Sequence, residues 1–132
     1  MKSQTITVYI DAPADRVYAF AANEENLPRW APSFFRSLSR EGERWIVDSP
    51  LGRACFAFVA RNAFGVLDHR IELPSGQECF NPMRVIANGR GSEIMFTLFQ
   101  SEGMSEQDFA RDAELVRGDL DALRRLVEQD AG

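Results

Sequence analysis

The sequence predicts an α+β fold in which seven antiparallel strands pack against one long C-terminal helix. The helix is indicated between Ser105 and Gln129, where apolar residues recur at spacings of 3 and 4 and form one stripe. The strands are indicated between Phe34 and Gln100 by alternating side chains separated by tight-turn sequences. Strands that follow one another through tight turns must be antiparallel. The predicted order is therefore one strand, two short helices, six strands and one long helix.

The first third of the chain contains one strand and the two short helices. Residues 4–10 alternate apolar and polar side chains, which predicts a half-buried strand. Pro13 lies where a first helical turn would begin, and Val17 with Phe20 gives that helix an apolar side. A second short helix or turn is expected over residues 27–32.

The middle of the chain contains the other strands. They are expected over residues 34–40, 44–48, 53–60, 64–73, 78–87 and 92–100. Turn residues separate them, as in Pro50-Leu51 and Ser75-Gly76. The long helix then begins after Ser105, whose hydroxyl is a good N-cap.

Turn lengths set strand register, and register sets the face on which each side chain lies. Even-length turns place Trp45 opposite Phe56, Phe56 opposite His69, and Ile71 opposite Phe80. The more apolar face, which is expected to meet the helix, then contains Trp45, Val47, Phe56, Phe58, Leu67, His69, Ile71, Phe80, Arg84 and Ile86. In the last strand two inward sets stay open, namely Ile94, Phe96 and Leu98, or Met95, Thr97 and Phe99.

The two cysteines are expected to be free thiols. Cys55 and Cys79 lie on strands that have another strand between them. Two strand spacings amount to about 9.6 Å, which is too far for a disulfide.

Composition limits the classes of function. The 132 residues fit a single domain, 1–132, and a hydrophobic content of 45% allows a sizeable core. A net charge of -5 argues against nucleic acid or an anionic membrane as the main partner. No apolar signal region or run of about 18 apolar residues occurs, so we expect a soluble, cytoplasmic protein without membrane insertion. No phosphate loop, dinucleotide fingerprint or metal-ligand spacing is found, so no cofactor or metal is expected.

Two stretches of the chain resemble a known superfamily. The opening, ITVYIDAPADRVYAFAANEENLPRWAPSF over residues 6–34, combines an Ile-rich strand with Ala-Pro-x-x-x-Val-Tyr and Leu-Pro-x-Trp segments. The sequence NGRGSEIMFTLFQ followed by a terminal helix completes the pattern. It resembles the helix-grip fold of the START-like (SRPBCC) superfamily, which includes polyketide cyclases, dehydratases and lipid-transfer domains. The resemblance implies a curved antiparallel sheet wrapped around the C-terminal helix, with an apolar cavity between them. It supplies no fixed catalytic motif, because this fold hosts binders and enzymes alike.

The candidate ligand-binding residues follow from the inward face and this implied cavity. They are Trp30, Phe34, Trp45, Phe56, Phe58, Leu67, His69, Phe80, Arg84, Phe109 and Val116. His69, the only histidine, is either a general acid or base, a polar anchor, or a hydrogen-bonded interior residue. Arg84 either binds a ligand carboxylate or enolate, forms an internal ion pair such as one with Glu93, or lies at the open end of the cavity. No second inward acid is expected.

Three functions are compatible with these residues. The favoured one is binding of a small hydrophobic molecule, lipid-like or aromatic, by a monomer or homodimer. The second is a polyketide cyclase- or dehydratase-like enzyme in which His69 and Arg84 are catalytic. The third is an interaction subunit that uses an apolar patch on the outer sheet face, formed by Cys55, Ala57, Val59, Val66, Met83 and Val85.

Overall fold

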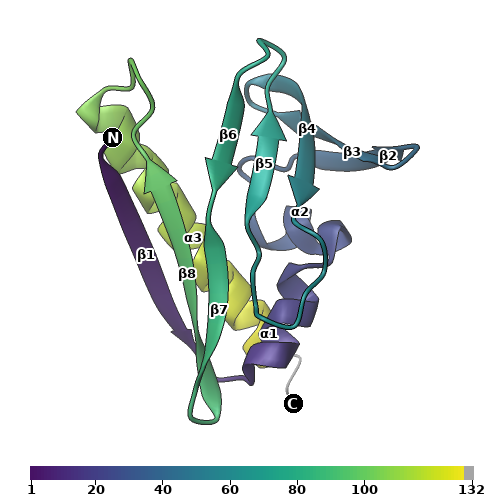
Figure 1. Ribbon diagram of the computed structural model, residues 1–132, viewed down its shortest axis with the longest axis vertical. Coiled ribbons are helices and arrows are strands. Elements are labelled where there is room, and N and C mark those ends of the chain that lie inside the picture. The colour runs from purple at the N-terminus through teal and green to yellow at the C-terminus, as the bar shows by residue number, and fades with distance from the viewer. Residues whose placement is uncertain (130–132) are drawn as a thin grey trace.

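A long C-terminal helix lies diagonally across one side of an antiparallel sheet in the computed structural model of the protein (Figure 1). The structure describes residues 1–129, so the last three positions of the expected domain lie outside the described residues. In chain order the elements are β1 (Ser3–Ile10), α1 (Ala14–Ala21), the single-turn helix η1 (Glu24–Asn26), α2 (Leu27–Trp30), β2 (Ser37–Glu41), β3 (Arg44–Ser49), β4 (Gly52–Phe58), β5 (His69–Glu72), β6 (Glu78–Asn81), β7 (Met83–Asn88), β8 (Gly91–Phe99) and α3 (Glu106–Gln129).

The curved β-structure consists of two antiparallel parts that meet at Pro82. One part has the strand order β1-β8-β7 and the other has the order β2-β3-β4-β5-β6. The single strand expected over residues 78–87 is broken into β6 and β7, because Pro82 has no N–H to donate to a ladder. Two hydrogen bonds still join the parts: the Thr97 N–H donates to the Pro82 carbonyl at 2.9 Å, and Asn81 Nδ2 donates to the Thr97 carbonyl at 3.3 Å. Beyond this junction β6 and β8 diverge (Figure 1).

Most of the predicted faces on β3, β4 and β5 are correct. Trp45 is opposite Phe56, as the short turn at Pro50 predicts. Phe56, however, is opposite Ile71, and His69 is opposite Phe58. The predicted pairing of Phe56 with His69 is therefore wrong by two residues, because the connection between β4 and β5 is longer than a tight turn. A shift of two residues leaves every side chain on its predicted face.

The faces predicted for β6 and β7 are wrong, because the turn between β5 and β6 has an odd length. Residues 73–77 form this turn, which is closed by a hydrogen bond from the Leu73 N–H to the Gln77 carbonyl at 2.9 Å. Ile71 therefore pairs with Cys79 rather than Phe80. This shift by one residue turns Phe80, Arg84 and Ile86 away from the helix. The residues that face inward on β6 and β7 are Cys79, Asn81, Met83 and Val85.

The structure also decides the inward set of β8, which the sequence left open, and it contradicts the predicted apolar patch on the outer face. In β8 the inward set is Ile94, Phe96 and Leu98. Met83 and Val85 are buried in the core, so the expected apolar patch on the outer face is not formed by those six residues.

The helix α3 has the predicted start and the predicted apolar stripe. The Ser105 hydroxyl accepts a hydrogen bond from the Asp108 N–H at 3.0 Å, which confirms the N-cap. Both ends of the helix are bound to the residues that flank β1: Lys2 Nζ lies 2.7 Å from Glu106 Oε2, and the Asp11 N–H donates to Glu128 Oε2 at 2.9 Å. The buried residues of α3 are Phe109, Ala113, Leu120, Leu123 and Val127.

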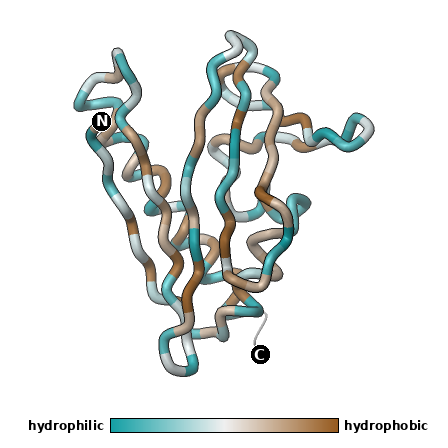
Figure 2. Tube along the Cα trace, viewed as in Figure 1, coloured by the Kyte–Doolittle hydropathy of each residue, from teal (hydrophilic) through white to brown (hydrophobic). Residues whose placement is uncertain are grey.

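Hydrophilic residues concentrate at the hairpin tips, as at the turn between β2 and β3 (Figure 2). Cys55 and Cys79 are free thiols, as predicted, but only Cys79 faces α3. Within residues 1–129, none of the helices combines the length and the apolar character needed to cross a membrane.

Candidate functional site

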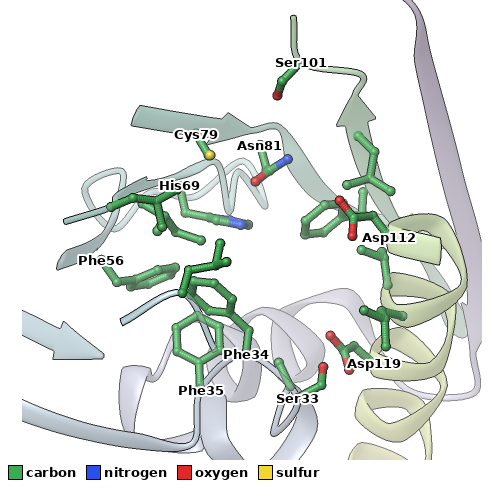
Figure 3. Close-up of a pocket in the computed structure, with 18 of the residues that line it drawn as sticks. Ser33, Phe34, Phe35, Phe56, His69, Cys79, Asn81, Ser101, Asp112 and Asp119 are labelled. Atoms are coloured by element: carbon green, nitrogen blue, oxygen red, sulfur yellow. The ribbon is translucent and has the colours of Figure 1, made fainter. Parts of the chain in front are cut away.

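A cavity of about 630 Å³ lies between the sheet and α3 (Figure 3). The sheet wall consists of Phe56, Phe58, His69, Ile71, Cys79, Asn81, Phe96 and Leu98. The helix wall consists of Asp108, Arg111, Asp112, Leu115, Val116, Asp119 and Leu120. Residues 27–35 close one end, whereas the exposed residues Leu51, Gln77 and Glu102 mark where the cavity meets solvent.

The walls are largely aromatic on the sheet side. The Phe56 ring stands edge-on to those of Phe35 and Phe58, with centroids 5.2 and 4.8 Å apart. The His69 ring lies within this cluster, 5.3 Å from Phe56 and 5.4 Å from Phe96. Edge-on pairs at these separations are favourable and hold the rings in place. The sheet wall is therefore a preformed apolar surface with one polar ring in it.

His69 is held in one tautomer. Its side chain is 6% exposed, and Nδ1 lies 3.0 Å from the Leu67 carbonyl. A carbonyl oxygen can only accept, so Nδ1 carries the proton. Burial lowers the pKa of His69, although the bond to Leu67 and the charge of Asp68 oppose that shift. The neutral ring therefore presents Nε2 as an acceptor, and the ring points into the hollow towards α3 (Figure 3). Within residues 1–129 no group hydrogen-bonds Nε2.

Two carboxyl groups face His69 from the helix side. Asp112 and Asp119 point from α3 into the hollow (Figure 3). Burial raises the pKa of Asp119 to about 7. Burial also raises the pKa of Asp112, and the nearby charge of Asp108 adds to this effect, whereas Arg111 opposes it. The expectation that the cavity has no second inward acid is therefore wrong.

A signal for these two acids exists in the sequence. Asp112 and Asp119 are seven residues apart, so they lie on one side of a helix two turns apart, next to Val116. The sequence-based prediction assigned only apolar residues of this helix to the inner side. Asp112 and Asp119 are missed in that prediction because they lie at the edge of the apolar stripe. In the structure this edge faces the hollow rather than solvent.

Arg84 does not lie in the cavity. Its side chain is 48% exposed, and its guanidinium donates from Nε and Nη2 to the Asp68 carboxylate at 3.0 and 2.8 Å. The prediction of Arg84 on the inward face is wrong, because the odd-length turn before β6 reverses the faces of β6 and β7. The partner of this ion pair is Asp68, not Glu93.

The other predicted site residues divide into two groups. Those that line the cavity are Trp30, Phe34, Phe56, Phe58, His69 and Val116. Those outside its lining are Trp45, Leu67, Phe80, Arg84 and Phe109. Leu67 and Phe109 are buried in the core, and Trp45 packs beside it under the Arg40 guanidinium. Phe80 is 44% exposed on the outer face, for the same reason as Arg84.

A split antiparallel sheet, a long C-terminal helix across it and a cavity between them identify the architecture. The protein has the helix-grip fold. Solved structures support this at the level of fold: the protein XoxI from Bacillus cereus superposes with a TM-score of 0.76 at 15% identity, over 100% of this chain and 99% of the other. The resemblance to the START-like (SRPBCC) superfamily is thereby confirmed for the fold.

Two further helix-grip structures carry informative names. A START superfamily protein from Mycobacterium smegmatis has a TM-score of 0.66 at 14% identity, over 96% of this chain and 97% of the other. The di-domain ARO/CYC protein BexL of the BE-7585A biosynthetic pathway has a TM-score of 0.70 at 21% identity, over 97% of this chain and 47% of the other. No protein-family model matches the sequence, and no curated protein does.

Proposed function

We propose that the protein binds a small hydrophobic molecule, lipid-like or aromatic, in the cavity between the sheet and α3. One observation carries this proposal: a preformed hollow of about 630 Å³ whose sheet wall consists mainly of aromatic and aliphatic side chains. Cavities of this size and character are typical of sites for small molecules. The net charge of -5 supports a small molecule over nucleic acid as the partner.

The test uses N-phenyl-naphthylamine, a neutral apolar dye whose fluorescence rises in dry surroundings. We expect the parent protein to bind it, and we expect Val116→Trp, which fills the cavity from α3, to weaken binding by about tenfold or more. Glu114→Trp is the matched control, because Glu114 is exposed on the same helix and does not line the cavity. Equal binding by the two folded variants would show that the dye binds elsewhere, and no binding by the parent would contradict the proposal.

A second candidate, an enzyme that transfers a proton to or from the bound molecule, is favoured by the Nε2 acceptor of His69 inside an apolar cavity. Arg84 has no part in it, because its guanidinium is bound to Asp68 outside the cavity. For this function, His69→Phe should lower turnover by about 100- to 10,000-fold while binding is retained. Turnover that survives this substitution would exclude His69 as the acid or base.

A further inference from the structure

We propose that the ligand of this cavity is an apolar molecule that carries a hydrogen-bond-donating cationic group, such as a protonated amine, held at the α3 wall that carries Asp112 and Asp119. The inference rests on the proposed function and adds the chemical class of the ligand. It follows from two features of the described cavity lining: the carboxyl groups on the helix side and the Nε2 acceptor of His69 on the sheet side.

The helix side of the cavity is acidic. Among residues 1–129, four carboxyl groups line it, from Glu102, Asp108, Asp112 and Asp119, against one guanidinium, that of Arg111. Arg111 Nη1 lies 3.4 Å from Asp108 Oδ1, so this cation is directed at Asp108. Partly buried charges interact more strongly than charges in water, because the surrounding medium screens them less. An anionic ligand would therefore be repelled from this wall, and a cationic one would be attracted to it.

The sheet side also accepts hydrogen bonds. His69 is almost fully buried, its Nδ1 is engaged by the Leu67 carbonyl, and its Nε2 faces the hollow as an acceptor (Figure 3). A ligand that satisfies this atom must itself donate. Around it, the rings of Phe34, Phe56 and Phe96 provide an apolar surface for the body of the ligand, and their faces attract a cation.

Proton binding at Asp119 makes the expected affinity depend on pH. Burial raises the pKa of Asp119 to about 7. The other charged or titratable groups among the described residues that line the cavity are Asp108, Arg111 and Asp112 of α3 itself, His69 of β5, Cys79 of β6 and Glu102 before the helix. A bound ammonium group favours the ionised form of Asp119. Below about pH 7 the ligand must displace a proton, so its affinity should fall as the pH is lowered.

The experiment compares three naphthalenes of nearly equal shape by calorimetric titration: naphthylmethylamine as the cation, naphthylmethanol as the neutral analogue and naphthoate as the anion. At about pH 8 we expect the amine to bind about tenfold more tightly than the alcohol, and naphthoate to bind most weakly. We expect Asp119→Asn and Asp112→Asn each to reduce the ratio of amine to alcohol affinity several-fold, with the alcohol affinity little changed. Glu114→Gln, an exposed position on the same helix, should retain the parent ratio.

The outcomes separate this inference from the proposed function. Equal affinities for amine and alcohol, or a preference for naphthoate, would overturn the cationic-ligand inference while leaving apolar binding intact. Failure of all three naphthalenes and of the neutral dye would overturn the proposed function itself. If neither aspartate variant folds, the parent protein still decides: its preference for the amine should shrink between about pH 8 and about pH 5.5, and a constant preference would contradict the role of Asp119.

Discussion

Arg84 and Asp68 form a bidentate ion pair on the side of the sheet away from the cavity. Nε and Nη2 of Arg84 donate to Oδ1 and Oδ2 of Asp68 at 3.0 and 2.8 Å, and the Met83 N–H donates to the same Oδ1 at 2.9 Å. The hydrogen bond from Arg84 is the main cause of the lowered pKa of Asp68. The pair therefore joins the segment before β5 to β7, next to the point where the sheet divides.

We expect Asp68→Asn to destabilise the protein by about 2 kcal/mol at neutral pH, since a charge-assisted pair is lost while the amide can still accept from Met83. The pKa of Asp68 is lowered in the folded state, so its contribution is present above the unfolded-chain value of 3.8 and is lost as the pH falls below it. Urea unfolding should show a constant difference from about pH 5 to about pH 8 and a shrinking one below about pH 4. Asp48→Asn, at an exposed position of β3, is the control; a similar loss there would contradict a specific role for the pair.

Asp119→Asn should stabilise the folded protein at high pH, whereas Asp68→Asn should destabilise it. Burial raises the pKa of Asp119 from 3.8 to about 7 on folding, so the stability it contributes is fully present below about pH 4 and is lost as the pH rises through about 7. Above that pH we expect the ligand-free variant to be more stable than the parent by about 2 kcal/mol, after discounting for screening by solvent. Thermal or urea unfolding between about pH 4 and about pH 8 measures this. A gain that does not depend on pH would show that Asp119 does not titrate in this range.

His69→Phe should retain the fold and the binding of a neutral apolar dye, because the phenyl ring preserves the shape of the aromatic cluster. The same change removes the Nε2 acceptor, so the affinity for naphthylmethylamine should fall several-fold. Fluorescence titration of the dye and calorimetry of the amine measure the two effects separately. Phe80→Leu, on the outer face, should change neither; a tenfold loss of dye binding by His69→Phe would contradict this assignment of roles.

The two thiols should differ in reactivity, and only one should respond to ligand. Burial raises the pKa of the Cys79 thiol, and the charge of Asp112 adds to the shift, so Cys79 should react slowly with a thiol reagent at about pH 8. Because Cys79 lines the cavity, bound naphthylmethanol should slow it further. Cys55 lies outside the cavity lining, where Arg44 Nη2 donates to its Sγ at 2.8 Å. Rates measured on Cys55→Ser and Cys79→Ser test this; equal protection of both thiols would indicate a general change rather than an occupied cavity.

The sequence predicts correctly those features of the fold that depend on residues close together in the chain. The stripe on α3 and the cap at Ser105 follow from helical spacing and local hydrogen bonding, and the structure confirms both. The pairing of Trp45 with Phe56 follows from one short turn. Where a connection is longer, as between β4 and β5, the predicted pairing is already wrong by two residues.

The candidate site is predictable only in part. Phe56, Phe58 and His69 were placed on the cavity side because their strand faces were correct. Phe80 and Arg84 were not, because the β5–β6 turn is odd in length and each later side chain changes sides. Turn length depends on which backbone groups hydrogen-bond, as Leu73 and Gln77 do, and several lengths are compatible with the same residues.

The sequence by itself determined the order of elements apart from the break at Pro82, the apolar stripe of the last helix and the aromatic character of the sheet wall. Only the tertiary structure decided that Asp112 and Asp119 face a hollow and that Arg84 is bound to Asp68 outside it. Helical and strand periodicities are local properties of the chain. Whether the edge of a helical stripe meets solvent, core or a cavity depends on how far the sheet stands from the helix, and that separation is set by packing between residues far apart in sequence.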